Sequence, residues 1–385
     1  MLTLITFILV LSLLVFVHEL GHFVVAKKLG LIPKEFGFGF PPRAWGIYKS
    51  KDGTWKTTRK KGEVEDAANT VYSVNWVPLG GFVNIGEDEE GEDDPNHFTN
   101  KPIWQRATIL SAGVSMNVIL AMVLIIIGLM IGLPQMIDEE IDPRAQVSDE
   151  RIQIVQVLPE SPAKQAGIKM GDIIASINDN QFTNYEAIQQ YNEEHIGQGL
   201  TYQIKRGKEN MIMQITPEII EETGQGGIGI AIAEVGTVKY PWYLAIGKGI
   251  KATFMLTWII IVAFYELFKG LIFGLGVSAD LAGPVGIAAI TGQVARLGFI
   301  YVMQFTALLS INLAIINFLP IPALDGGRVF FLIIEKIRRK SMKRKLEAGL
   351  NQAFFWLLML AVLIVTFRDV SRFGDTFRLY WDKMF

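Results

Sequence analysis

The feature that most constrains this chain is an apolar run at its start that contains three ionisable residues. Over residues 2–17 the only polar side chains are threonine and serine, and apolar residues resume after His22 as far as Lys27. About twenty apolar residues are needed to cross ~30 Å of hydrocarbon. The run lacks the basic start and small-residue cleavage site of a signal peptide. The sequence therefore predicts a retained transmembrane helix over residues 1–27.

The ionisable residues of this span form the motif His18-Glu19-Leu20-Gly21-His22. Two histidines four residues apart project from one face of a helix and can hold one zinc ion. Glu19 is then placed to take a proton from a water molecule on the zinc, whose pKa the metal lowers to roughly 7. Such a pattern also arises by chance on soluble helices, but ionisable groups inside a span cost at least ~2.5 kcal/mol each. The motif therefore predicts the metal site of a metalloprotease.

Composition agrees with a membrane protein that also has water-facing parts. Of the 385 residues, 50% are hydrophobic and 19% are charged. The formal net charge of -2 gives no electrostatic support for a nucleic-acid partner. Since there are no cysteines, a bound metal has to be held by His, Asp or Glu.

Hydropathy predicts four transmembrane helices, at residues 1–27, 108–134, 299–327 and 353–370. Basic residues flank the 28–107 loop and gather in the 328–352 loop, so the positive-inside rule predicts that both loops are cytoplasmic. The N-terminus and a small soluble domain, which turn signals indicate over residues 150–220, then lie on the opposite side. Residues 371–385 form a C-terminal tail.

The apolar stretch Trp242 to Phe273, within the 240–298 region, is long enough to be a fifth span. A fifth crossing would put seven basic residues of the 328–352 loop outside the cell. We therefore expect the 240–298 region to be amphipathic, and to lie at the membrane interface or re-enter without crossing.

The third zinc ligand is less certain from the residues alone. His97 and His195 stand in polar surroundings that are typical of surface residues. Asp325 follows Pro320 and Pro322, which break the third span, and the predicted topology puts it on the same side as the histidines. It could equally cap the next helix, and both readings stay open on this ground.

Two aromatic-rich, strand-like runs, Phe36 to Pro42 and Tyr72 to Pro78, predict a β-hairpin in the 28–107 loop. A simple surface hairpin would show the same pattern. The acidic run Glu87 to Asp94 is typical of a solvated loop, and we assign it no site.

Several motifs together resemble the bacterial site-2 proteases of peptidase family M50, especially the regulator of sigma-E protease and its Gram-positive relatives. The likeness covers nearly the whole chain and includes His18 to His22, Gly80-Gly81-Phe82, Lys101 to Arg106, Asn117, Leu281 to Ile287, and Asn317 to Gly327. It implies a polytopic α-helical membrane protein with four spans, a membrane-associated β-hairpin region and one extracytoplasmic α+β PDZ domain. Family members often have proline where this chain has Val114, and the sigma-E type has two PDZ domains.

The resemblance also implies roles for individual residues. His18, His22 and Asp325 would bind one zinc ion per chain, and Glu19 would be the catalytic base. Asn317, with Pro320 and Pro322, would contact the substrate backbone. The β element would present an edge to which an unfolded substrate adds as a strand.

The implied activity is proteolysis within the membrane. A multi-pass protein of the bacterial inner membrane would cut a single-span protein, such as an anti-sigma factor or a remnant signal peptide, on the cytoplasmic side of the lipid bilayer. An upstream site-1-type protease would make the first cut outside. The PDZ domain would either bind a peptide C-terminus or act as a size filter. One rival interpretation is a catalytically silent, membrane-anchored PDZ scaffold, which needs neither Glu19 nor the three ligands. A second is a metal transporter, but two histidines and an aspartate near one face do not form a pathway through four spans.

Overall fold

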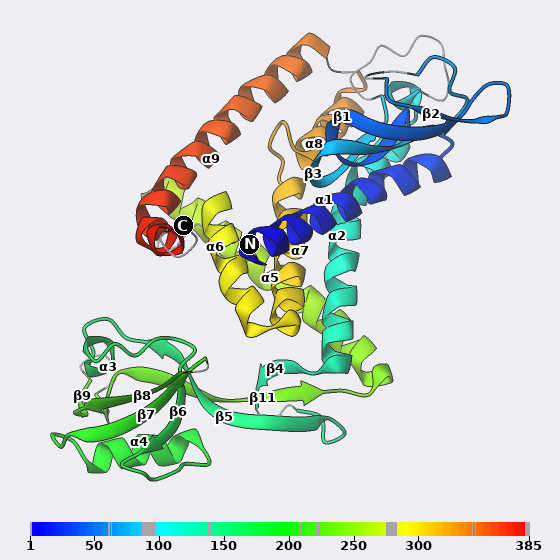
Figure 1. Ribbon diagram of the computed structural model, residues 1–385. Helices are drawn as coiled ribbons and strands as arrows, with labels where there is room; N and C mark the ends of the chain where they lie inside the picture. Colours follow the sequence, from blue (N-terminus) through cyan, green and yellow to red (C-terminus); the bar gives the residue numbers. More distant parts are fainter. Residues whose placement is uncertain are drawn as a thin grey trace. The chain divides into compact units, whose positions relative to one another are not determined.

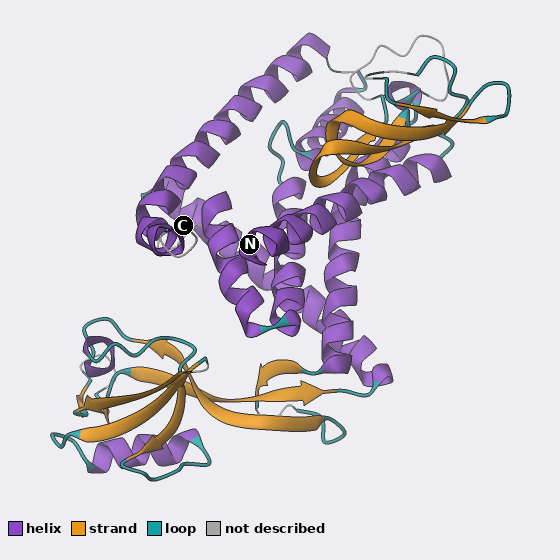
Figure 2. Ribbon diagram, viewed as in Figure 1, coloured by secondary structure: helices purple, strands orange, loops and turns teal. Residues whose placement is uncertain are grey.

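The computed structural model describes residues 2–60, 62, 64–86, 97–137, 141–207, 209–220, 224–274, 283–340, 342 and 344–381. The chain divides into two compact units, one of residues 1–125 with 249–385 and one of residues 126–248. Helices dominate the first unit, and strands dominate the second (Figures 1 and 2).

Long apolar helices make up most of the first unit. The helices are α1 (Leu2–Lys28), α2 (Ile103–Ile131), α5 (Trp242–Phe273), α6 (Pro284–Leu297), α7 (Phe299–Phe318), α8 (Asp325–Arg338) and α9 (Arg344–Trp381), with a 3-10 turn at Phe98–Asn100. Within the described residues, five helices are long and apolar enough to span a membrane: α1, α2, α5, α7 and the Lys345–Ser371 part of α9. Because the predicted interfacial stretch is one continuous 32-residue helix, the four-span count stays a prediction.

Small residues let the helices around α1 approach closely. A Cβ on Gly21 would lie 2.4 Å from the carbonyl oxygen of Ala112 in α2, and one on Gly292 of α6 would lie 2.5 Å from the Thr3 side chain. Helix α6 is in turn held to α9, because the Gly286 N–H donates to the buried Asp369 carboxylate at 2.7 Å. These contacts join α1, α2, α6 and α9 without bulky intervening side chains.

The 28–107 loop folds into a three-stranded sheet rather than a simple hairpin. Its strands are β1 (Glu35–Lys49), β2 (Trp55–Thr58) and β3 (Val71–Asn84), in the order β2-β1-β3. Residues 35–38 pair with both 71–74 and 81–84, because β3 bends back on itself. Among the described residues, the 81–84 segment pairs on one side only, so it forms an edge of this sheet.

One face of this sheet packs on α1 (Figure 1). The Phe36 ring lies 4.4 Å from that of Phe23 and 5.5 Å from that of Phe16, measured between centroids. Residues 78–81 also contact α1, since the Gly80 N–H donates to the Ser12 hydroxyl at 3.2 Å. Helix α1 thus fixes the sheet edge beside the His18–His22 motif.

The second unit is built on a six-stranded sheet of order β4-β11-β5-β6-β7-β8. Its strands are β4 (Leu133–Met136), β5 (Gln146–Val157), β6 (Ile173–Ile177), β7 (Leu200–Arg206), β8 (Glu209–Ile215) and β11 (Ile230–Lys239). Helices α3 (Pro162–Gln165) and α4 (Tyr185–Glu194) and a short pair, β9 (Glu218–Ile219) and β10 (Gly226–Gly227), complete it. Its core consists mainly of isoleucines, with a fully buried Tyr202. The domain therefore extends beyond residues 150–220 at both ends.

Candidate metal centre

Three side chains that are distant in sequence come together at the middle of the first unit. His18 Nε2 lies 2.9 Å from Asp325 Oδ2, and His22 Nε2 lies 3.4 Å from the same oxygen. The two Nε2 atoms are 3.2 Å apart. Both histidines are buried, and the Asp325 side chain is 22% exposed. The structure thus brings together the three ligands expected from the sequence.

Gly113 of α2 faces the two histidines of α1. A Cβ on Gly113 would lie 2.4 Å from His22 Nε2 and 2.8 Å from His18 Nε2. Any side chain there would occupy the space in which both nitrogens face Asp325. Gly113 therefore leaves room for the ligand cluster.

A second contact with α2 orients His22. Its Nδ1 lies 2.9 Å from the carbonyl oxygen of Ile109, which can only accept a hydrogen bond. Nδ1 therefore carries the proton, and the Nε2 lone pair is free to bind a metal.

Asp325 is positioned by a tight turn after α7. A Cβ on Gly326 would lie 2.3 Å from the Phe318 carbonyl carbon, and one on Gly327 would lie 2.2 Å from the Ile321 oxygen, so both residues must be small. Leu324 is the N-cap of α8 and makes no side-chain capping bond. Asp325 follows it as the first helical residue, so its carboxylate faces the histidines rather than capping the helix.

Glu19, His22 and Asp325 line one cavity of about 420 Å³. The other lining residues are Phe82, Val83, Asn84, Ile85, Gly86, Ala323 and Arg328. The Glu19 carboxylate interacts with the backbone of Val83 in the sheet edge. Burial lowers the pKa of Arg328, whereas the Glu347 carboxylate acts in the opposite direction.

Other predicted residues lie elsewhere. Asn317 is the last residue but one of α7, and Pro320 and Pro322 lie in the turn that follows. None of the three lines the Glu19 cavity. His97 caps the 3-10 turn through Thr99, and His195 stacks on Tyr191 at 4.2 Å in the second unit.

The sequence reasoning gave no role to Gly113, to the Ile109 carbonyl or to Arg328. The available signal for the first is a glycine inside the predicted second span.

The cluster suits a zinc ion. One donor atom from each of His18, His22 and Asp325 lies within 4.8 Å of the others, and nitrogen and carboxylate oxygen are both zinc ligands. Three protein ligands leave a fourth position for water or substrate, as catalytic zinc sites require. Together with Glu19 in the cavity and a helix long enough to cross a membrane, this defines a membrane-embedded metallohydrolase site.

The sequence profile of Peptidase family M50 matches residues 6–59 and 62–361. The chain belongs to this family, which confirms the resemblance read from its motifs. It is 30% identical to the regulator of sigma-W protease RasP of Bacillus subtilis and 30% identical to the zinc metalloprotease RasP of Geobacillus kaustophilus. Each match covers 96% of this chain and 98% of the relative.

A smaller likeness involves a solved structure. A segment covering 21% of this chain is 26% identical to 92% of the PDZ domain of an SdrC-like protein from Listeria innocua, with a TM-score of 0.20. That score alone does not establish the fold of the segment.

Proposed function

We propose that the chain is a zinc-dependent intramembrane endopeptidase that cleaves single-span membrane proteins in or near their transmembrane segment. The observation that carries this proposal is the buried cluster of His18, His22 and Asp325 with Glu19 in the same cavity. Two of the ligands and the glutamate belong to α1, which is long and apolar enough to cross the membrane. Membership of peptidase family M50 supports the same reaction.

His18, His22 and Asp325 would hold the zinc, which, when bound, polarises water and the scissile carbonyl. Glu19 is the nearby group that can accept the proton of the attacking water and deliver it to the leaving amine. His22 keeps its Nε2 lone pair free through its bond to Ile109. The base and the ligands thus serve one reacting centre.

The sheet edge supports a way of holding the substrate. A transmembrane helix has its peptide bonds paired internally, so it has to be straightened before it can be cut. The 81–84 segment borders the Glu19 cavity and pairs on one side only within the described sheet. A substrate segment that adds here as a strand would replace its helical hydrogen bonds with bonds to the edge.

Anti-sigma factors and remnant signal peptides are the substrates we propose. The name of the Bacillus subtilis relative, a regulator of sigma-W protease, favours the first class. An upstream site-1-type protease would shorten the substrate outside the membrane. Asn317, Pro320 and Pro322 would then contact the substrate only if it extends beyond the described cavity.

The proposed setting is the bacterial inner membrane, with the active site toward the cytoplasm. Four spans place the basic 28–107 and 328–352 loops inside and the second unit outside. As a PDZ domain, that unit would admit shortened substrates or bind their new C-termini. A catalytically silent PDZ scaffold is less well supported, because it needs neither Glu19 nor the ligand cluster.

The test is cleavage of a tagged single-span substrate by purified wild-type protein and by Glu19→Gln, with zinc measured in both. We expect both samples to hold about one zinc per chain, and Glu19→Gln to lose activity by roughly 10²–10⁴-fold. If neither protein cut any of several substrates despite bound zinc, the scaffold interpretation would replace this one.

A further inference from the structure

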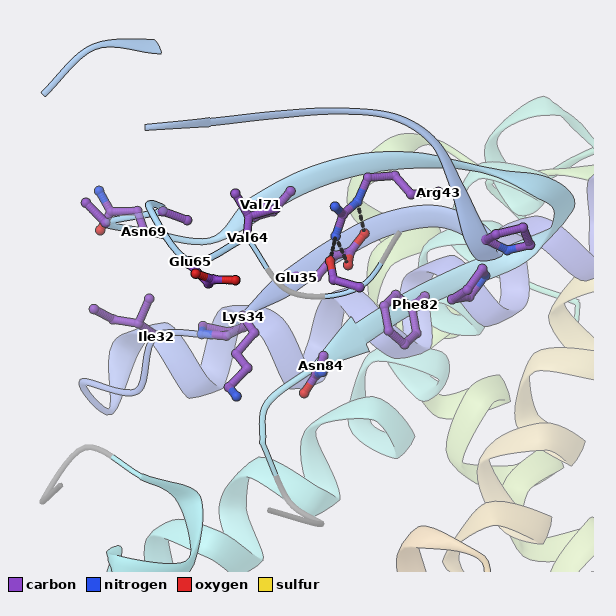
Figure 3. A pocket seen from close by; sticks show the side chains of 16 residues that line it. Ile32, Lys34, Glu35, Arg43, Val64, Glu65, Asn69, Val71, Phe82 and Asn84 are labelled. Atoms are coloured by element: carbon purple, nitrogen blue, oxygen red, sulfur yellow. Dashed lines mark hydrogen bonds and ion pairs between the residues drawn. The ribbon is translucent and has the colours of Figure 1, made fainter. Parts of the chain in front are cut away.

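A cavity of about 730 Å³ lies on the β1–β3 sheet (Figure 3). Glu35, Val71 and Asn84 line it, and they are in register with one another across the sheet. Phe36 and Tyr72, the next residues along the strands, contact α1 instead. Because successive side chains alternate between faces, the cavity opens on the face away from α1.

The outer wall of this cavity includes Gly62, Val64, Glu65 and residues 67–69, and the Arg43–Glu35 ion pair ties Gly62 to the sheet. Arg43 Nε donates to Glu35 Oε1 at 2.9 Å (Figure 3), and Arg43 Nη2 donates to the Gly62 carbonyl at 3.1 Å. Arg43 is only 6% exposed. Since the charges of Arg43 and Glu35 neutralise each other, we expect the cavity to select a ligand by its size and shape more than by its charge.

This cavity and the catalytic one share lining residues at the sheet edge. Phe82 and Asn84 line both cavities, whereas Val83 lines only the catalytic one. The Asn84 carbonyl accepts from the Lys34 N–H at 2.7 Å and so points into the sheet. Because the hydrogen-bonding groups of successive residues in a strand point to opposite sides, the backbone N–H and C=O of Val83 point away from β1. There the backbone of Val83 interacts with the Glu19 carboxylate.

We propose that the 730 Å³ cavity is a substrate subsite that takes a large side chain of an extended polypeptide. This rests on the proposed protease function. A segment added along residues 81–84 has alternate side chains on the Phe82–Asn84 face, and these enter the cavity. The intervening side chains face α1. The subsite therefore selects residues by size at every second position next to the cleaved bond.

The test fills the cavity from its exposed loop. Ala68 is exposed and lines the cavity, so Ala68→Trp reduces its volume without disturbing a core residue. Thr57→Trp is the matched control, since Thr57 is also exposed but does not line it. Both variants and wild type are assayed on single-span substrates that carry Ala or Trp at successive positions flanking the cleavage point.

We expect Ala68→Trp to lower kcat/KM by roughly tenfold for substrates with Trp at alternate positions, and to leave Ala substrates within about twofold. Thr57→Trp should behave as wild type on all of them. An equal loss on every substrate, or no loss on any, would overturn the subsite. Failure of the wild type to cut the series would instead count against the protease function itself.

Asn117 of α2 lies beside Nδ1 of His18, the ring nitrogen that does not face Asp325. Asn117 is completely buried, its amide nitrogen lies 3.4 Å from His18 Nδ1, and its Oδ1 has no hydrogen-bond partner among the described residues. A 180° rotation of the amide exchanges its nitrogen and oxygen. Oδ1 would then accept from the protonated Nδ1 of His18.

We propose that Asn117 is a positioning residue that fixes the tautomer of His18, as the Ile109 carbonyl does for His22. The His18 proton is then held on Nδ1, so that Nε2 faces Asp325 as a metal ligand. The Ser310 hydroxyl donates to the backbone carbonyl oxygen of Asn117 at 2.7 Å, which holds this part of α2 against α7.

The readout is the zinc dissociation constant, measured by chelator competition on full-length protein. Asn117→Leu should weaken zinc binding by roughly 10–100-fold. Asn117→Asp, which keeps an acceptor, should bind like wild type, as should the nearby control Ser115→Ala. Zinc binding within twofold in Asn117→Leu would refute the role, and so would an equal loss in Asn117→Asp.

Discussion

The two sides of the catalytic cavity are built in opposite ways. On the ligand side the surrounding contacts are tight. The Ile109 carbonyl orients His22, Gly113 leaves just enough room for both imidazoles, and a tight turn with two glycines positions Asp325. On the strand side the cavity meets the backbone of residues 81–84 and, beyond it, a roomy pocket with the exposed Ala68.

This contrast follows from what each side has to do. Metal ligands and a general base act only within a few tenths of an ångström of the correct geometry. A protease that accepts several substrates instead needs contacts that ignore side-chain identity, which main-chain hydrogen bonds provide. Changes on the ligand side should therefore affect zinc, and changes on the strand side should affect substrate use.

The largest expected effect comes from Gly113→Ala on the ligand side. The new methyl group would lie 2.4 Å from His22 Nε2, so the imidazoles must move out of the position that faces Asp325. We expect zinc content to fall from about one per chain to near zero, and cleavage to be lost with it. Metal analysis of the purified protein measures this directly.

The matched control is Gly349→Ala, since Gly349 is a helical glycine with nothing within 4 Å of the added Cβ. It should keep its zinc, and the removal of a helical glycine should stabilise the helix by up to ~1 kcal/mol. A Gly113→Ala protein with full zinc and activity would show that the ligand side is far more tolerant than the contacts indicate.

A smaller effect, of a different kind, is expected from Gly80→Ala on the strand side. Gly80 has φ +82°, and an added Cβ would lie 2.5 Å from the Val15 side chain of α1. The edge should shift relative to Glu19, which lowers kcat/KM by roughly tenfold or more through misplaced substrate. Zinc content should stay at the wild-type value.

The accompanying variant Val15→Ala removes Cγ1, one of the two Val15 atoms at 2.5 Å, but leaves Cβ and the backbone strain. The double variant Val15→Ala/Gly80→Ala should therefore recover part of the lost activity. Loss of zinc in Gly80→Ala would break the contrast, because it would mean that the two sides of the cavity are not independent.

The ligand motif could be predicted because it depends on local rules. Helical periodicity places His18 and His22 on one face, and the membrane cost of ionisable groups makes a chance motif unfavourable. For Asp325 the broken helix and the charge topology left a ligand and a helix cap equally open, and the family resemblance implied the ligand. Membership of the M50 family confirms the family resemblance, and the roles of the individual ligands stay a prediction.

Contacts between elements could not be predicted in the same way. The roles of Gly113 and Ile109 depend on how far α2 is rotated and how closely it crosses α1, which no single-helix pattern specifies. The sheet register, in which residues 35–38 lie between two parts of β3, depends on pairing between distant residues. A pattern of two strand-like runs could indicate only a hairpin.

The smallest effect on function is expected where α2 is tied to α8, the helix that begins with Asp325, at a distance from the ligand cluster. Arg106 of α2 donates to Glu335 of α8 at 2.7 Å, and their side chains are 14% and 19% exposed. Glu335→Gln weakens this charged hydrogen bond, so the free energy of unfolding should fall by ~1–3 kcal/mol. Thermal unfolding in detergent measures the loss, and zinc content should be unchanged at low temperature.

Glu266→Gln serves as its control, because the Glu266–Lys269 pair is 57% and 41% exposed and should contribute less than ~1 kcal/mol. If Glu335→Gln were as stable as this control, the ion pair would contribute nothing measurable to the contact of α2 with α8. The two helices would then be held together by apolar packing, since Ile109, Leu110 and Leu332 belong to one buried cluster.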